Sequence, residues 1–159
     1  MLKRAFNLAV MALGVVLLGI AESGCTSTEP PGHPDWMTSL PQALTKAKAE
    51  HKLVLMDFTG SDWCAPCREL HDRVFETANF KNYADSNLVL VVVDFPEHKA
   101  QSAEERQTNE ALKKQFDVPG YPTIILLDGD DKVLTKQTGI DADHSSQFIA
   151  WLEKAAKKS

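Results

Sequence analysis

Residues 53–69, with the sequence LVLMDFTGSDWCAPCRE, contain the segment from which the fold can be inferred. Residues 53–58 form a short apolar run followed by turn residues, which predicts a buried strand. A helix is expected to begin near Cys64, and Pro66 suits its first turn because a missing amide hydrogen costs nothing there. The CxxC pair of Cys64 and Cys67 therefore follows a strand and opens a helix, which is the context typical of a redox-active pair.

The expected position of Cys64 at the start of a helix favours its thiolate form. Unpaired amides and the helix dipole stabilise negative charge there and lower the pKa of the thiol. A thiolate of lowered pKa is both a nucleophile at neutral pH and a good leaving group. Cys67 lies about one turn further on, close enough to attack a mixed disulfide formed on Cys64.

The same two thiolates could instead bind zinc or copper(I), since sulfur is a ligand for both metals. His71 supplies a third ligand, but a structural zinc takes four, and the chain has no second CxxC. Covalent haem attachment would need a histidine at position 68, where the chain has Arg68. Redox chemistry is favoured, no metal or other cofactor is predicted beyond the cysteine pair itself, and copper(I) handling remains the alternative.

Further strands and helices are expected on either side of this segment. Strands are expected at residues 88–94 (LVLVVVD) and 122–128, the latter joined by a turn at 129–131 to a hairpin partner at 132–136. Helices are expected at residues 39–51, 109–116 and 143–157, with a break or second piece of the helix after Cys64 at 77–85. Residues 95–108 are mostly polar and read as a long connection. The order predicts an α/β fold with a central mixed β-sheet flanked by helices on both faces.

The N-terminal segment has the layout of a secretory signal. Lys3 and Arg4 precede an apolar run at residues 5–21, which is short for a spanning helix. The following Ser23-Gly24-Cys25 resembles the end of a bacterial lipobox, although Glu22 departs from that motif and cleavage after Ala21 is an alternative. We expect a lipoprotein-type signal peptide at residues 1–24, lipidation of Cys25, a flexible tether at residues 25–35 and one domain at residues 36–159.

Cysteine count and charge agree with this division of the chain. Three cysteines leave one unpaired, and lipidation of Cys25 would leave Cys64 and Cys67 as an even pair. The formal net charge is -5, and the basic residues cluster only in short runs at the two chain ends. This distribution argues against a nucleic-acid partner, which requires lysine and arginine gathered on one face.

Several motifs together resemble the thioredoxin superfamily over residues 37–158. They are Asp57-Phe58, Trp63-Cys64-Ala65-Pro66-Cys67, Asp94 and Val118-Pro119-Gly120-Tyr121-Pro122-Thr123. The stretches 58–64 and 94–96 are similar to an exported bacterial branch of thioredoxin-like proteins. Residues 63–75 are also similar to the C-terminal domain of the thiol–disulfide interchange protein.

The resemblance implies a role for each matching residue. Cys64 would be the attacking thiol and Cys67 the resolving one. Pro122 would be a cis-proline facing the disulfide, and the Tyr121 backbone would bind an extended substrate. Asp57 matches a buried acid that moves protons at the resolving cysteine, although one extra residue separates it from Cys64.

Four further side chains have less specific interpretations. Trp63 would cover the disulfide or pack at the edge of its loop. Trp36 and Trp151 read as helix-packing residues. His71 reads as an exposed helix histidine, although it lies on the helical face of the cysteines and could tune Cys67.

Burial of Asp57 would raise the pKa of its carboxyl group.

The function implied by the resemblance and the leader is thiol–disulfide exchange outside the cytoplasm. We expect an exported bacterial protein on the periplasmic side of a membrane, held there by lipid on Cys25. It would reduce or isomerise disulfides in exported cysteine-containing proteins, receive electrons from an upstream thiol donor and act as a monomer. The alternatives are the copper(I)-handling protein and a thioredoxin-like binding module without catalytic turnover.

Overall fold

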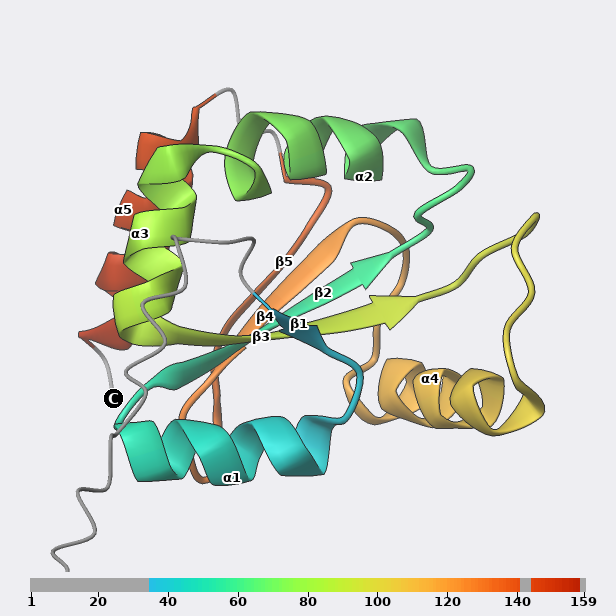
Figure 1. Ribbon diagram of the computed structural model, residues 1–159, viewed down its shortest axis with the longest axis horizontal. Helices are drawn as coiled ribbons and strands as arrows, with labels where there is room; N and C mark the ends of the chain where they lie inside the picture. The colour runs from blue at the N-terminus through green and yellow to red at the C-terminus, as the bar shows by residue number, and fades with distance from the viewer. Residues whose placement is uncertain (1–34, 141–143, 158–159) are drawn as a thin grey trace, which may run out of the picture.

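The computed structural model describes residues 35–140 and 144–157, which form one mixed sheet between two layers of helices (Figure 1). The strands are β1 (Trp36–Met37), β2 (Leu53–Thr59), β3 (Leu88–Asp94), β4 (Thr123–Leu127) and β5 (Val133–Thr138). The helices are α1 (Leu40–Glu50), α2 (Ala65–Leu70), α3 (Ala78–Asn87), α4 (Ala103–Gln115) and α5 (Ser145–Ala156). A π-helical turn, η1 (His71–Phe75), continues α2.

The sheet has the strand order β1-β3-β2-β4-β5, with β2 at its centre. β1, β3 and β2 run parallel, whereas β4 is antiparallel to β2 and β5 is antiparallel to β4. The register pairs Thr59 with Asp94, so β2 and β3 end side by side. The loop that leaves β2 therefore emerges at the middle of the sheet edge where the parallel strands end.

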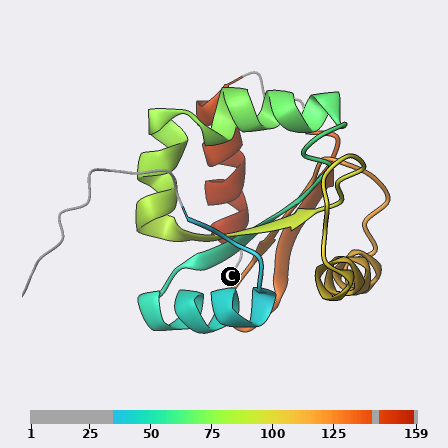
Figure 2. The same cartoon turned by 45° about the vertical axis from the view of Figure 1, so that its right-hand side comes forward.

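Side chains of β2 alternate between the two faces of the sheet, as the period of a strand requires. Val54, Met56 and Phe58 belong to a core that also contains residues of α1 and α4. Leu55 belongs to a second core with residues of α2, η1, α3 and α5. Figure 2 shows the same division, with α1 and α4 on one side of the sheet and the remaining helices on the other. Asp57, two residues beyond Leu55, consequently faces α2.

The expected fold class is confirmed: the sheet is mixed, and helices cover both of its faces. The strand expected at residues 88–94 has those bounds, and the ends of most other expected elements differ by one or two residues. The helix after Cys64 ends at Phe75, and α3 begins at Ala78 within the region expected to hold a break.

The expectation for residues 95–108 was wrong in its second half. Helix α4 begins at Ala103, six residues before the expected start at Asn109. Ser102 caps this helix, since its Oγ accepts a hydrogen bond from the backbone N–H of Glu105 at 3.1 Å. Ser102 and Glu105 have the spacing of a capping box, and this signal was available in the sequence. The segment is polar because its first turns are largely exposed.

Trp36, which the sequence analysis interprets as a helix-packing residue, packs on a helical turn but does so from a strand that was not expected. Trp36 lies in β1, a two-residue strand that pairs with Leu90 and Val91 of β3. Its ring lies 5.1 Å from the ring of Phe75, so it packs on η1 across the edge of the sheet. A strand of two residues has no periodicity to detect. Trp151 does lie on a helix, α5, with its ring 5.5 Å from that of Phe148.

The expected leader, tether and lipidation site, including Cys25, lie outside the described residues. Within residues 35–140 and 144–157, none of the helices has the length and apolar character needed to span a bilayer.

Candidate active site

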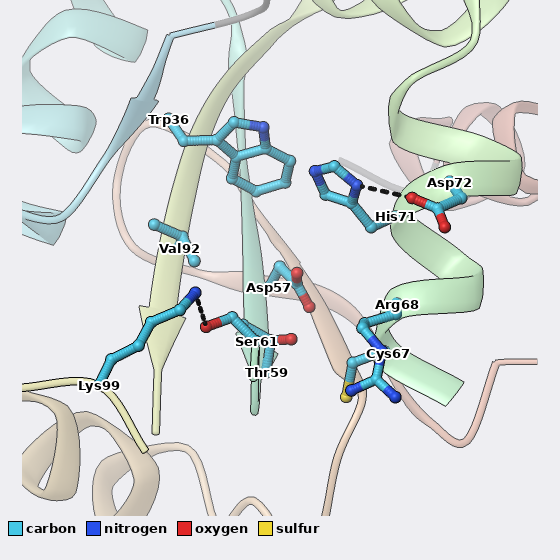
Figure 3. A pocket seen from close by; sticks show the side chains of 10 residues that line it. All are labelled: Trp36, Asp57, Thr59, Ser61, Cys67, Arg68, His71, Asp72, Val92 and Lys99. Atoms are coloured by element: carbon cyan, nitrogen blue, oxygen red, sulfur yellow. Dashed lines mark hydrogen bonds and ion pairs between the residues drawn. The ribbon is translucent and has the colours of Figure 1, made fainter. Parts of the chain in front are cut away.

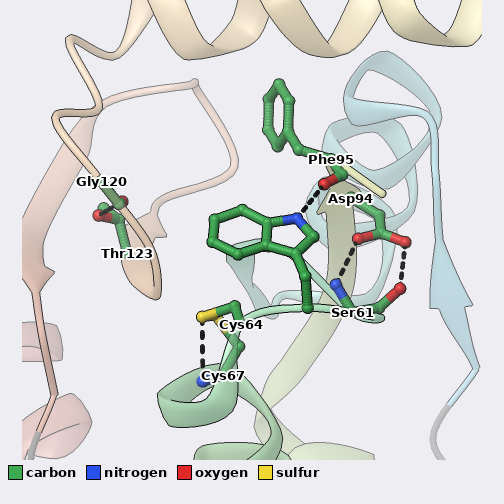
Figure 4. The surroundings of a disulfide bond; sticks show 8 residues. Ser61, Cys64, Cys67, Asp94, Phe95, Gly120 and Thr123 are labelled. Carbon is green, nitrogen blue, oxygen red and sulfur yellow. Dashed lines mark hydrogen bonds between the residues drawn. A yellow bond between two sulfur atoms is a disulfide. The ribbon is translucent and has the colours of Figure 1, made fainter. Parts of the chain in front are cut away.

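Cys64 and Cys67 form a disulfide at the start of α2, with 2.02 Å between their sulfur atoms and 5.3 Å between their Cα atoms (Figure 4). Cys64 is the N-cap residue of α2, and its Sγ accepts a hydrogen bond from the backbone N–H of Cys67 at 3.3 Å. Each cysteine is only 4% exposed. A thiolate on Cys64 would keep this donor and would also face the positive end of the helix dipole, so the start of α2 favours Cys64 as the charged sulfur.

Trp63 covers the loop that leads into the disulfide. Its indole N–H donates to the carbonyl oxygen of Phe95 at 2.8 Å, and its side chain remains 37% exposed. The ring also lies over Gly60: a Cβ atom at that position would come within 2.5 Å of the indole. Glycine at position 60 therefore lets Trp63 fold back over its own loop while one face stays in solvent.

The Tyr121–Pro122 peptide bond is cis, as the resemblance implied. The Tyr121 ring meets the Trp63 ring edge-on at 5.9 Å, which places this peptide beside the loop that enters Cys64. Tyr121 also stacks on Phe95 at 5.0 Å, and the Lys113 ammonium lies 5.1 Å from the centre of its ring. Trp63, Phe95 and Tyr121 together form the aromatic surface beside the disulfide. Phe95 and Lys113 were not among the site residues expected from the sequence, because only the tertiary fold brings them to Tyr121.

Asp57 is buried behind the disulfide on the α2 side of β2. It is 8% exposed, and its Oδ1 has no hydrogen-bond partner in the described part of the chain. Burial, with a smaller contribution from the nearby Asp94 carboxylate, raises the pKa of this carboxyl group to about 7. The pKa shift that the sequence suggested is thus present, and Asp57 can accept or release a proton near neutral pH.

Two further carboxylates organise the loops around the site. Asp94, at the end of β3, accepts hydrogen bonds from the backbone N–H of Ser61 at 2.9 Å and its hydroxyl at 2.6 Å. Asp62 accepts the backbone N–H groups of residues 97, 98 and 99 at 2.8 to 3.0 Å. These bonds outweigh the desolvation of Asp62 and lower the pKa of its carboxyl group. Ser61 and Asp62 were not predicted from the sequence as residues of the site. The available signal was the acidic side chain of Asp62, two residues before Cys64.

A pocket of about 420 Å³ lies between α2 and the ends of β2 and β3 (Figure 3). Its wall includes Cys67 but not Cys64, and Asp57 also lines it. His71 lines the pocket with a side chain that is 51% exposed, in keeping with its interpretation as an exposed helix histidine. Its two ring nitrogens lie 3.4 Å from Asp72 and 3.5 Å from Glu76. The described residues contain no group of three or more histidine, cysteine or acidic side chains arranged to hold a metal ion.

A helix-capping CxxC disulfide on this sheet defines the chain as a thiol–disulfide oxidoreductase. The chain belongs to the thioredoxin-like domain family, whose model matches residues 40–156.

Two curated relatives illustrate this membership. The disulfide bond reductase DsbH of Chlamydia pneumoniae is 34% identical over 119 residues, which are 75% of this chain and 71% of the relative. The thiol:disulfide interchange protein DsbD of Actinobacillus pleuropneumoniae is 30% identical over 118 residues, which are 74% of this chain but only 18% of that protein. The similarity to DsbD is therefore to one part of a much longer protein.

Solved structures support the same fold. The structure of a DsbH oxidoreductase superposes with a TM-score of 0.73 at 31% identity, and the match covers 84% of this chain and 92% of that one. The oxidised C-terminal domain of DsbD from Neisseria meningitidis gives a TM-score of 0.56 at 21% identity, covering 76% of this chain and 99% of that domain. At that identity the second match shows a shared fold alone.

Proposed function

We propose that this protein is an exported, membrane-tethered reductase of disulfide bonds in other exported proteins, with Cys64 as its nucleophile. The observation that carries the proposal is the placement of Cys64 at the cap of α2, where the neighbouring Trp63 ring meets Tyr121 of the cis Tyr121–Pro122 peptide. The 34% identity to a protein named as a disulfide bond reductase supports reduction as the direction of the reaction.

In the reduced protein, the Cys64 thiolate attacks one sulfur of the substrate disulfide and expels the other as a thiolate. A mixed disulfide between Cys64 and the substrate results. The thiolate of Cys67 then attacks Cys64, restores the Cys64–Cys67 disulfide and releases the substrate with both of its cysteines reduced. Because Cys67 is buried, this second step requires a base that can remove its proton away from bulk water.

Asp57 is the base that we assign to Cys67. Both residues line the same pocket, and the carboxyl group of Asp57, with a pKa of about 7, is ionised in part of the molecules at neutral pH. A base with a pKa near the working pH combines a useful ionised fraction with a useful affinity for the proton.

The aromatic surface is the part of the molecule that we expect the protein substrate to contact. Trp63 is exposed beside Cys64, and Tyr121 packs against it. The backbone of Tyr121, ahead of Pro122 and β4, would hydrogen-bond an extended substrate segment in the manner of an added strand. Pro122 itself carries no amide hydrogen, so the backbone hydrogen bonds to the substrate would come from its neighbour Tyr121.

Export and tethering rest on the sequence at the N-terminus. We assign residues 1–24 to a lipoprotein signal, Cys25 to the lipid attachment site, residues 25–35 to a tether and residues 36–159 to the catalytic domain. A tether of this length would keep the domain near the membrane while leaving the disulfide free to meet substrates.

Insulin reduction with dithiothreitol as electron source tests the catalytic proposal. Wild type should accelerate precipitation of the insulin B chain, and Cys64→Ser should reduce the rate to that of dithiothreitol alone. Cys67→Ser should instead accumulate a mixed disulfide on Cys64. Wild-type protein that is inactive but retains one copper(I) per chain would replace the proposal with copper handling; a protein with neither property would be a binding module.

Two more measurements test direction and tethering. A reductase should have a reduction potential near that of thioredoxin, about -270 mV, whereas a value near about -120 mV would indicate an oxidase. In bacteria, the full chain should sediment with membranes, and Cys25→Ser should move it to the soluble fraction with its insulin-reducing rate unchanged. Retention of Cys25→Ser in the membrane fraction would contradict lipidation.

A further inference from the structure

Three successive backbone N–H groups after β3 converge on one side chain of the active-site loop, residues 60–64. Oδ1 of Asp62 accepts the N–H of residue 97 at 3.0 Å, and its Oδ2 accepts those of residues 98 and 99 at 2.8 Å each. Residues 95–102 belong to no helix or strand, so regular secondary structure does not hold this segment. Asp62 lies two residues before Cys64 and therefore joins the segment to the loop that enters α2.

The bonds to Asp62 complete the backbone hydrogen bonding at the start of this connection. The N–H of Phe95 donates to the carbonyl oxygen of Thr59 at 2.9 Å, and Pro96 has no N–H to place. The next three N–H groups are those that Asp62 accepts. The Lys99 ammonium adds a bond to the Ser61 hydroxyl at 3.3 Å, so Asp62 makes three of the four hydrogen bonds between residues 97–99 and the active-site loop.

The segment that Asp62 holds begins beside the residue that connects the aromatic surface. The carbonyl oxygen of Phe95 accepts the indole N–H of Trp63 at 2.8 Å, and Figure 4 shows this N–H directed at the carbonyl. The ring of Phe95 stacks on that of Tyr121 at 5.0 Å. The position of Phe95 therefore affects both of the rings that we expect a protein substrate to contact.

The side chain of Asp62 suits this role because it is charged at neutral pH. Desolvation disfavours the charged form, but the three backbone hydrogen bonds outweigh it and lower the pKa of the carboxyl group. Hydrogen bonds to an ionised acceptor are shorter and stronger than those between neutral groups. The three N–H dipoles also offset the negative charge that this carboxylate would otherwise place near the Cys64 thiolate.

We propose that Asp62 is a positioning residue for disulfide exchange with protein substrates: it holds residues 97–99 on the active-site loop and so keeps the aromatic surface in the arrangement that a substrate segment binds. The inference rests on the proposed function, because it concerns the surface that we assign to those substrates. A surface that is already ordered loses less conformational entropy on binding than one that the substrate must order. Loss of the Asp62 bonds should therefore weaken substrate binding and leave the chemistry at the two sulfur atoms intact.

Insulin reduction at a fixed concentration of dithiothreitol separates binding from chemistry. Asp62→Ala should raise KM for insulin at least about fivefold and change kcat by less than about twofold. The reduced variant should react with hydroxyethyl disulfide, a small substrate that needs no extended surface, within about twofold of the wild-type rate. Asp62→Asn keeps one of the two acceptor oxygens and should raise KM less, and it preserves the test if the alanine variant does not fold.

Asp128→Ala is the matched control. Oδ1 of Asp128 accepts the backbone N–H groups of Asp130 and Lys132 at 2.9 and 3.0 Å, so this side chain also holds a turn through main-chain bonds. The turn joins β4 to β5 at the end of the sheet where Leu127 pairs with Val54, away from the cysteines. Asp128→Ala should leave KM for insulin unchanged.

Amide hydrogen exchange tests the bonds themselves and needs no enzymatic activity. In Asp62→Ala, the amide hydrogens of residues 97–99 should exchange at least about tenfold faster than in wild type, because they lose their acceptor. Those of residues 130 and 132 should exchange at the wild-type rate in this variant and faster in Asp128→Ala.

Three results would overturn the proposal: an unchanged KM in Asp62→Ala, an equal rise in Asp128→Ala, or a parallel loss of kcat and of the rate with hydroxyethyl disulfide. In each of these cases, insulin reduction by the wild type would show that the proposed function still stands. Wild-type protein that does not reduce insulin would instead remove the proposed function and this inference with it.

Discussion

Asp57 occupies a position of β2 at which strand alternation would otherwise place an apolar side chain. Leu55, on the same face, is fully buried in the core beneath α2. Burial removes water from the carboxyl group and so disfavours its charged form in the folded protein. The pKa is raised for this reason. The same property makes Asp57 useful as a base, so stability and chemistry are coupled at this one residue.

The pH dependence of stability should reveal Asp57 directly. Between its unfolded pKa near 3.8 and its folded pKa of about 7, the folded chain holds a proton that the unfolded chain has lost, so wild-type stability falls as pH rises through this window. Asp57→Asn removes this fall in stability, because an asparagine side chain does not titrate. Relative to wild type, the variant should gain about 4 kcal/mol between about pH 4 and about pH 8.

Urea unfolding of both oxidised proteins across this pH range measures the gain. Asp85→Asn, which removes an exposed carboxylate on α3, serves as the control and should show no comparable trend. A constant difference between Asp57→Asn and wild type at all pH values would contradict the assignment. Insulin reduction by Asp57→Asn should also be slower at neutral pH, because Cys67 would lack its base.

Gly60 is a second position where one atom decides the local structure. Gly60→Ala would place a Cβ atom within 2.5 Å of the Trp63 indole, so the ring must move and lose its hydrogen bond to the Phe95 carbonyl. The expected cost is about 1 to 3 kcal/mol of unfolding free energy, with a changed tryptophan fluorescence. Gly120→Ala is the matched comparison: its Cβ would meet nothing within 4 Å, and stability should change by less than about 0.5 kcal/mol.

At the scale of the element, one part of α4 could be predicted from local sequence signals and another part could not. Leu112 and Phe116 are the core residues at its C-terminal end, and this end was predicted. The preceding turns are largely exposed and polar, so periodicity alone does not identify them. Their helical state depends on the Ser102 cap and on Glu104 and Glu105 in the first turn, where acidic side chains favour the helix dipole.

Two serine substitutions separate a capping side chain from a serine that merely precedes a helix. Ser102→Ala removes the acceptor for the Glu105 amide and should lower the free energy of unfolding by about 1 kcal/mol. Ser39 is the N-cap residue of α1 but makes no side-chain cap hydrogen bond, so Ser39→Ala should have much the smaller effect. Equal losses in urea unfolding of the two variants would show that the Ser102 bond contributes nothing.

At the scale of the whole molecule, β1 links the start of the domain to the core. Trp36 and Met37 pair with β3, and the Trp36 ring packs on Phe75. A chain that begins at Asp35 should therefore unfold at the same temperature as the full protein. Removal of residues through Met37 should lower the free energy of unfolding by at least about 2 kcal/mol, because β3 loses a partner and Phe75 loses an aromatic contact.

Thermal unfolding of the two truncated chains compares them directly, and their insulin-reducing rates provide a second readout. Destabilisation already in the chain that begins at Asp35 would mean that the first 34 residues contribute to the fold. In that case the assignment of residues 25–35 to a tether would be wrong.

The sequence by itself determined the strand–turn–helix unit around Cys64, the strand at residues 88–94 and the class of chemistry. Local signals suffice for these features: a β-branched run, a CxxC pair after a strand, and a proline suited to a first helical turn. The pairing of Thr59 with Asp94, the contact of Trp63 with Phe95 and Tyr121, and the pocket that joins Asp57 to Cys67 arise only in the tertiary structure. The reason is physical, because these contacts join residues distant in the chain and depend on sheet order and register. The structure thereby places two distinct surfaces around the disulfide, one on the side of each cysteine.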